Sequence, residues 1–173
     1  CLDKPLAKKL VALAGVDTPK WVVFDSSAGV TRESVSVLRF PVFVKPVWEG
    51  SSKGIRLNSR VDGFERLAEV VSRLLDAYRQ PVMAEEFIQG EEVTVGVVGN
   101  SPARVVGIMH IVPLQPNSDF VYSLEVKRDW QRLVKYECPA KFPAVLRKRI
   151  EDSALGSFQV LGCRDFGRLD FRV

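Results

Sequence analysis

The pattern of apolar and polar positions predicts helices and strands in mixed order along the chain. Helices are indicated where apolar residues recur every three or four positions, and strands where they alternate or run together. Helices are expected over residues 3–15, 31–38, 62–80 and 143–161. Strands are expected over residues 21–24, 41–46, 54–61, 82–88, 92–98, 103–112 and 164–173. Helices mixed with antiparallel hairpins predict an α+β fold.

The segment before Pro81 has the clearest helical pattern. Asp62 and Glu65 have capping-box spacing, and an apolar stripe runs from Phe64 to Tyr78. Asp3 is expected to cap the first helix, which Gly15 closes. Residues 113–139 follow no regular period and are expected to form a mobile loop.

The last strand alternates strictly. Leu169, Phe171 and Val173 are expected on one face, with Arg168, Asp170 and Arg172 on the other. One face of this strand should therefore pack on a core, while the other carries charge.

Composition narrows the class of protein. The chain has 173 residues, of which 46% are hydrophobic and 27% charged, so it reads as a soluble globular protein. No apolar run approaches the roughly 20 residues of a membrane span, and residues 1–10 lack the apolar core of a signal peptide. A cytoplasmic location and no membrane partner are expected. The chain begins with Cys1 rather than methionine, which suggests a piece of something longer.

Charge and cysteines exclude some partners. The net charge is +4, but the lysines and arginines are scattered along the chain and form no aromatic and basic RNA-binding signature, so nucleic acid is not an expected partner. A ligand that carries phosphates suits the positive charge. The three cysteines are an odd number without C-x-x-C spacing, so neither a disulfide framework nor a zinc site is predicted.

A loop of small residues follows the strand that ends near Lys45. Gly50, Ser51, Ser52 and Gly54 would let backbone N–H groups and hydroxyls approach an anion, with Lys45 as a fixed cation. The loop matches neither the P-loop nor the dinucleotide fingerprint. An ordinary hairpin turn would have the same composition, so this loop alone leaves both interpretations open.

Two more segments carry candidate chemistry. In "MAEEFIQGEE", strand alternation puts Glu85 between Met83 and Phe87, which suits adenine, although a half-exposed edge strand would look the same. Near the chain end, Arg168 and Asp170 share a strand face, which suits a site that holds a metal ion together with developing negative charge, although a surface ion pair would look the same.

The order of these features resembles the ATP-grasp superfamily, and within it the D-alanine–D-alanine ligases, over residues 2–173. A small-residue loop after V-K-P precedes E-E-F-I, a glutamate, a loop lysine and G-R-x-D. The resemblance implies an ATP-grasp fold of two α+β lobes of antiparallel sheet and helices, with the nucleotide site between them. Residues 1–82 would form the small lobe with the phosphate-binding loop. Residues 83–173 would form the large lobe, truncated before the E-x-N metal motif.

The resemblance also assigns phosphate-binding roles. It implies that Lys4 and Lys45 contact the phosphates of ATP and that the loop at residues 50–54 folds over them. Ser51 would lie where phosphate meets the first substrate. Lys127 would reach the terminal phosphate when its own loop closes, although Leu124 and Arg128 stand where the family has aromatic neighbours.

Further roles come from the same resemblance. Glu85 and the backbone of Glu86, Phe87 and Ile88 would bind adenine. Glu92 would hold the ribose hydroxyls. Arg168 would stabilise the tetrahedral intermediate, and Asp170 would bind Mg²⁺.

The implied function is an ATP-dependent carboxylate–amine ligase that acts through an acyl phosphate in peptidoglycan precursor synthesis. Its small-molecule partners would be ATP and an amino acid such as D-alanine, and a homodimer is one option for the full-length protein. Because the chain stops before E-x-N, weak magnesium binding and little activity are expected of this piece alone. A non-catalytic ATP-binding or interaction module, and an ATP-grasp ligase for another substrate pair, are the alternatives.

Overall fold

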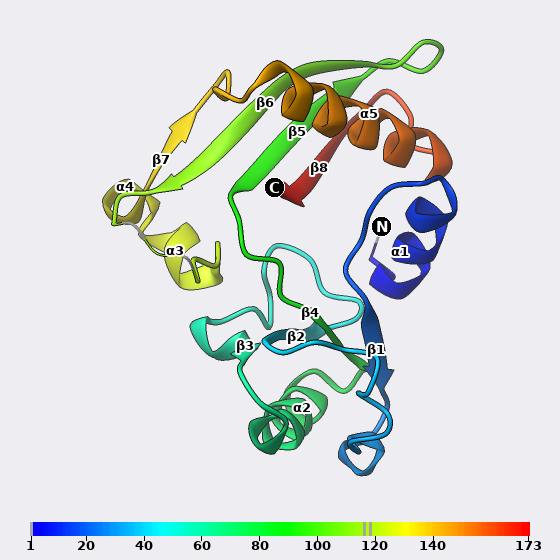
Figure 1. The fold of residues 1–173 in the computed structure, drawn as a ribbon, viewed down its shortest axis with the longest axis vertical. Coiled ribbons are helices and arrows are strands. Elements are labelled where there is room, and N and C mark those ends of the chain that lie inside the picture. The colour runs from blue at the N-terminus through cyan, green and yellow to red at the C-terminus, as the bar shows by residue number, and fades with distance from the viewer. Residues whose placement is uncertain (1, 116, 118) are drawn as a thin grey trace. The chain divides into compact units, whose positions relative to one another are not determined.

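The chain folds into two four-stranded antiparallel sheets and the helices around them (Figure 1). The structure is a computed structural model that describes residues 2–115, 117 and 119–173. The chain divides into two units. The first contains the residues up to Ala7, Pro19–Ile88 and Ser123–Arg128, and the second contains Lys8–Thr18, Gln89–Tyr122 and Asp129–Val173. This division differs from the sequence-based boundary between residues 82 and 83, because the strand after residue 81 pairs within the first sheet.

The helices and strands follow the predicted order for most of the chain. The helices are α1 (Lys4–Leu13), α2 (Phe64–Tyr78), α3 (Leu124–Arg128), α4 (Trp130–Leu133) and α5 (Ala144–Val160), with 3-10 turns η1 (Ser27–Gly29) and η2 (Leu57–Ser59). The strands are β1 (Trp21–Phe24), β2 (Val42–Pro46), β3 (Arg60–Val61), β4 (Val82–Glu86), β5 (Glu92–Val98), β6 (Arg104–Pro113), β7 (Val134–Glu137) and β8 (Phe166–Arg172).

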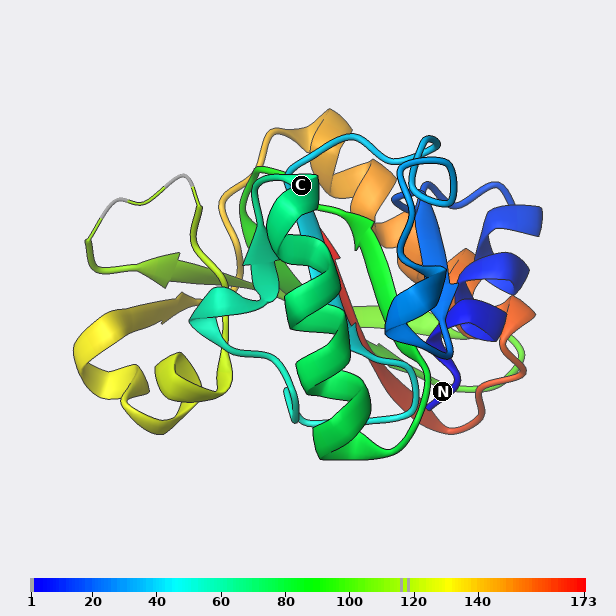
Figure 2. The same ribbon diagram turned by 90° about the horizontal axis from the view of Figure 1, so that it is seen from below.

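In the first unit, α2 covers one face of the sheet β1-β4-β2-β3, as Figure 2 shows. The buried side chains shared by the sheet and α2 are Val42, Val44, Val82, Ala84, Leu67, Val70, Val71 and Leu74. Burying each larger aliphatic side chain stabilises the unit by about 1.5–3 kcal/mol. Strand alternation then points the other side chains of β2 and β4 to the opposite face, away from α2.

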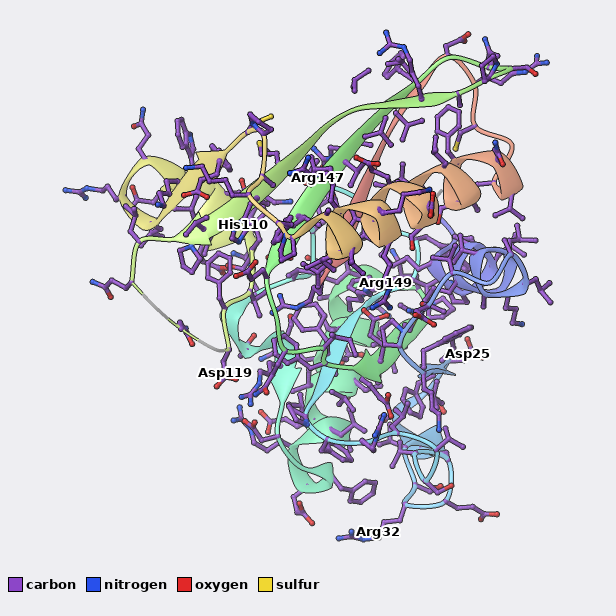
Figure 3. The ribbon with its side chains drawn as sticks, turned by 45° about the horizontal axis from the view of Figure 1, so that its top comes forward. Asp25, Arg32, His110, Asp119, Arg147 and Arg149 are labelled. Atoms are coloured by element: carbon purple, nitrogen blue, oxygen red, sulfur yellow. The ribbon has the colours of Figure 1, made fainter. Side chains whose placement is uncertain are left out.

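In the second unit, α5 packs on one face of the sheet β7-β6-β5-β8. Its core consists of Val93, Val95, Val97, Ile108, Ala140, Ile150, Ala154 and Phe158, with Leu169, Phe171 and Val173 packed against them. The alternation predicted for the last strand is confirmed. His110, labelled on β6 in Figure 3, lies on the α5 side of this sheet, with its ring centroid 5.4 Å from that of Phe142.

The two predicted caps have different outcomes. Asp3 does cap α1, because its Oδ1 accepts a hydrogen bond from the Leu6 backbone N–H at 2.9 Å. The capping box before α2 is wrong. The N-cap is Gly63, and Asp62 lies one position too early, where its carboxylate pairs with Arg60 at 2.7 Å.

Three predicted elements are also wrong. Residues 32–37 form turns rather than a helix, because Thr31 and Ser34 exchange side-chain to backbone hydrogen bonds of 3.0 Å that compete with helical ones. The strand expected over residues 54–61 is reduced to η2 and the two residues of β3. The region 113–139 holds α3, α4 and β7, and its residues 116 and 118 lie outside the described part.

Two remaining expectations concern thiols and membranes. Cys138 and Cys163 are free thiols, while Cys1 lies outside the described residues. Within the described part of the chain, every helix is too short or too polar to cross a membrane.

Candidate functional site

Lys45 and Glu85 meet on the face of the first sheet that is turned away from α2. In the register of β2 with β4, Lys45 is paired with Met83, and Phe43 with Glu85, so all four side chains share this face. The ammonium of Lys45 forms an ion pair with Oε1 of Glu85, and their side chains are only 17% and 12% exposed. The predicted phosphate lysine and the predicted adenine carboxylate are thus direct partners, which the sequence did not indicate.

Lys4 is bound to the start of the small-residue loop. Its Nζ donates hydrogen bonds to the carbonyl oxygens of Pro46 at 3.0 Å, Val47 at 2.9 Å and Glu49 at 2.5 Å. A lysine ammonium has three N–H donors, so these bonds occupy all of them. Burial, followed by the neighbouring charge of Lys45, lowers the pKa of Lys4 to about 8. Lys4 therefore fixes the root of the loop.

The loop turns sharply at its two serines. Ser51 and Ser52 have φ angles of 52° and 60°, and the Lys53 N–H donates to the Gly50 carbonyl at 3.0 Å. Positive φ at both central positions is typical of a type I′ turn, in which glycine and asparagine are usual. Holding two serines at positive φ costs free energy, and strained backbone of this kind is often found in functional loops.

Gln80, just before β4, braces the same loop. Its Oε1 accepts a hydrogen bond from the Trp48 backbone N–H at 2.6 Å, and its Nε2 donates to Oε1 of Glu49 at 3.1 Å. The Nζ atom of Lys53 also lies 3.8 Å from Oε2 of Glu49. Sequence reasoning missed Gln80, because a single polar residue beside a proline carries no periodic signal.

The helix that carries Lys127 is joined to the end of the loop. The Leu124 N–H lies 3.4 Å from the Ile55 carbonyl oxygen, and Arg56 Nη1 pairs with Oε1 of Glu125 at 2.9 Å. Burial alone would raise the pKa of Glu125, but hydrogen bonds from Ser123 and Arg56 lower it below its usual value. Within the first unit, α3 therefore lies against the end of the loop, although Arg56 and Glu125 are about seventy positions apart in the sequence.

The backbone expected to bind adenine begins at the last residue of β4. The N–H groups of Glu86 and Phe87 donate to the carbonyl oxygens of Lys20 at 3.0 Å and Pro41 at 2.9 Å, while the side chain of Ile88 is exposed. Burial would raise the pKa of Glu86, but hydrogen bonds from Arg39 lower it. These bonds hold the segment in an extended path beside the Lys45–Glu85 pair.

The second unit carries its own charged face on β5 and β8. The register pairs Glu92 with Arg172, Thr94 with Asp170 and Gly96 with Arg168. Thr94 Oγ1 donates to Oδ1 of Asp170 at 2.8 Å, and Arg168 Nε lies 3.2 Å from the same oxygen. Sequence reasoning found Glu92, Arg168 and Asp170 but missed Thr94 and Arg172 as their partners, since only the register reveals them.

Asp170 has few metal-ligating neighbours among the described residues. Among the described residues, no three histidine, cysteine, aspartate or glutamate side chains are grouped so that they could hold a metal ion. The contacts of Asp170 with Thr94 and Arg168 supply a hydroxyl and a cation instead of further carboxylates. The described residues therefore do not by themselves fit a complete Mg²⁺ site.

Solved structures resemble this chain over its whole length. The VanG D-Ala:D-Ser ligase from Enterococcus faecalis is 30% identical, with a TM-score of 0.78 over 99% of this chain and 48% of that one. The D-alanine–D-alanine ligase from Bacillus anthracis complexed with ATP has a TM-score of 0.74 at 22% identity, covering 100% of this chain and 50% of that one. The chain has the α+β fold of the ATP-grasp ligases.

Sequence comparison identifies the family. The profile described as "D-ala D-ala ligase C-terminus" matches residues 10–173, and the chain belongs to this family. The D-alanine–D-alanine ligases of Aquifex aeolicus (strain VF5) and Methylibium petroleiphilum are each 33% identical over 99% of this chain. The chain spans 54% and 52% of their lengths, about half of each relative. The predicted superfamily and fold are confirmed.

Proposed function

We propose that the chain is the ATP-binding part of a cytoplasmic ATP-dependent carboxylate–amine ligase of the D-alanine–D-alanine type, which serves peptidoglycan precursor synthesis. One observation carries the proposal. Lys4, the loop after Lys45 and the helix of Lys127 come together in the first unit through hydrogen bonds and ion pairs, although they are far apart in sequence. The family to which the chain belongs supports the same assignment.

Most of the proposed nucleotide contacts lie in the first unit and are consistent with this arrangement. Lys45, Lys127 and the loop at residues 50–54 bind the phosphates, with Lys4 holding the loop at its root. Glu85 and the backbone of residues 86–88 bind adenine, and Glu92 binds the ribose. Binding of a phosphate to Lys45 would compete with Glu85 for the ammonium, so the ion pair found here is expected to lengthen in the complex.

The proposed reaction has two steps. An oxygen of the D-alanine carboxylate attacks the terminal phosphorus of ATP, so that an acyl phosphate forms and ADP leaves. The amine of the second amino acid then attacks the acyl carbon, phosphate leaves, and the amine loses a proton. Positioning and charge stabilisation carry such chemistry without a side-chain nucleophile. Ser51 would orient the first substrate, and Arg168 would stabilise the tetrahedral intermediate.

We propose Asp170 as the ligand that this chain offers to Mg²⁺. Because its described surroundings do not complete a metal site, the phosphates of ATP and groups outside this chain would have to supply the other ligands. The proposed roles of Ser51 and Arg168 do not depend on the ion.

Two other functions have specific support. ATP binding without turnover is favoured by the incomplete carboxylate set around Asp170 in the described residues. A different second substrate is favoured by the likeness to the enterococcal D-Ala:D-Ser ligase. Both functions keep the nucleotide contacts proposed above, and they differ only in the reaction that the bound ATP undergoes.

Isothermal titration of the chain with ATP, together with phosphate-release assays with D-alanine, D-serine or L-alanine, separates these functions. ATP binding with little phosphate release is expected from the chain alone. A calorimetric titration that detects no binding at millimolar ATP would contradict the proposal. Brisk release with D-serine but not with D-alanine would favour the other substrate pair.

The affinity for ATP is expected to fall as pH rises above about 8, because Lys4 then loses its positive charge near Lys45 and one of the N–H donors that hold the start of the phosphate-binding loop. If ATP holds Lys4 protonated, the dissociation constant should increase by up to about tenfold per pH unit above that pKa. Lys4→Met should remove this dependence, whereas Lys9→Met, on the exposed side of α1, should keep it. Calorimetry between pH 7 and 10 measures the effect, and an unchanged slope in Lys4→Met would refute it.

The lowered pKa of Lys4 should make the free energy of unfolding rise with pH, whereas the affinity for ATP falls. This pKa is lowered in the folded chain from 10.5 to about 8, so the unfolded chain binds the proton more tightly between these values. Lys4 alone therefore makes the free energy of unfolding rise with pH in this window. A fall in ATP affinity over the same window cannot then be ascribed to loss of folding through Lys4.

A further inference from the structure

Arg172 connects three segments of the second unit. Its Nη2 donates a hydrogen bond to the Gly90 carbonyl oxygen at 2.9 Å, and its Nη1 donates to the Phe120 carbonyl oxygen at 3.0 Å. Nη1 also lies 3.8 Å from Oε2 of Glu92, and the Arg172 side chain is only 18% exposed. A guanidinium can serve several acceptors at once, because its donors form a rigid, planar fork.

Glu92 is held from a second side by the chain that follows Phe120. The backbone N–H of Tyr122 donates to Oε2 of Glu92 at 2.9 Å, which is the oxygen nearest Arg172. Glu92 and Arg172 are also directly opposite in the register of β5 with β8. The carboxylate is thus fixed by a cross-strand cation and by a backbone amide.

The segment that leads into Glu92 is anchored to the same strand end. The Glu91 N–H donates to the Val173 carbonyl at 2.9 Å, and the Val173 N–H donates back to Glu91 at 3.0 Å. Gly90 has a φ of 145°, and a Cβ there would lie 2.2 Å from the Val173 carbonyl oxygen. The end of β8 therefore determines where β5 begins, and with it the position of Glu92.

We propose that Arg172 is a positioning residue that fixes the carboxylate of Glu92 for the ribose hydroxyls of ATP. This inference rests on the proposed function, because it takes Glu92 as the ribose ligand. A glutamate side chain loses rotamer freedom when it binds, and a partner that orders it beforehand reduces that loss. Removing Arg172 should therefore weaken recognition of the ribose more than recognition of adenine or phosphate.

The test compares ATP with 2′-deoxy-ATP and 3′-deoxy-ATP, whose missing hydroxyls report the contact with Glu92. Wild-type chain is expected to bind ATP more tightly than at least one deoxy analogue. In Arg172→Met this preference should shrink by about tenfold, the size expected for a hydrogen bond to a charged group. Arg172→Lys should recover part of the preference, because it keeps the charge but loses the fork.

A double-mutant cycle isolates the coupling between the two residues. Glu92→Gln should also remove the preference, and Glu92→Gln with Arg172→Met together should lose little more than either change alone. Arg104→Met, an exposed arginine at the start of β6, is the matched control and should bind all three nucleotides as the wild type does. Titration calorimetry and thermal unfolding are measured for every variant.

Each outcome decides a different point. If Arg172→Met weakens ATP and both analogues by the same factor, Arg172 has only a structural role and the inference is wrong. The same holds if the wild type shows no preference for ATP over either analogue. If the wild type binds none of the three, the proposed function fails instead. If Arg172→Met does not fold, the affinities of Arg172→Lys and Arg172→Gln for ATP and the two analogues are compared instead, with the same criteria.

Discussion

Lys45→Met is expected to abolish measurable ATP binding and to lower the free energy of unfolding by about 3 kcal/mol. The change removes the proposed phosphate cation. It also leaves the carboxylate of Glu85, whose side chain is 12% exposed, without the partner that its burial requires. Breaking a buried pair by removing one member costs far more than the pair contributes to stability. Binding and stability should therefore fall together in this variant.

A second substitution separates the two effects. In Lys45→Met with Glu85→Gln the buried charge is gone, so most of the lost stability should return, whereas ATP binding should stay lost. Lys9→Met, which replaces an exposed lysine of α1, is the matched control and should change neither quantity. Urea unfolding and titration calorimetry measure the two quantities. Wild-type affinity in Lys45→Met would contradict the proposed phosphate role.

Periodicity was enough to predict most elements of the fold. The apolar stripe of α2, the alternation of β8 and the continuous apolar run of β2 each reflect burial against a core that the local sequence already encodes. Residues 31–38 show where this reasoning fails. Their apolar spacing suits a helix, but Thr31 and Ser34 satisfy each other's backbone N–H groups in a turn.

The candidate site was predicted as residues but not as contacts. Lys45 and Glu85 are forty positions apart, and their pairing depends on the register of β2 with β4. Thr94 and Arg172 likewise become partners of Asp170 and Glu92 only through the register of β5 with β8. Register is fixed by long-range packing, so local pattern and spacing cannot supply it.

Gly54→Ala is expected to lower the free energy of unfolding by about 3 kcal/mol and to weaken ATP binding. Gly54 ends the small-residue loop with a φ of +77°, which costs alanine about 1–2 kcal/mol. In addition, the new Cβ would lie 2.5 Å from both Cγ and Cδ of Pro46, a distance that requires a shift. Pro46 follows Lys45 directly, so the shift that relieves this clash should displace the phosphate-binding lysine.

Gly15→Ala is the matched control that separates backbone strain from the clash. Gly15 has a φ of +78°, nearly equal to that of Gly54, but no described atom lies within 4 Å of the position of its Cβ. Gly15→Ala should therefore cost only about 1–2 kcal/mol and leave ATP binding unchanged. The difference between the two variants in urea unfolding then measures the clash with Pro46. Equal losses would mean that the loop moves away from Pro46 freely, and the affinity for ATP should then be unaffected in both variants.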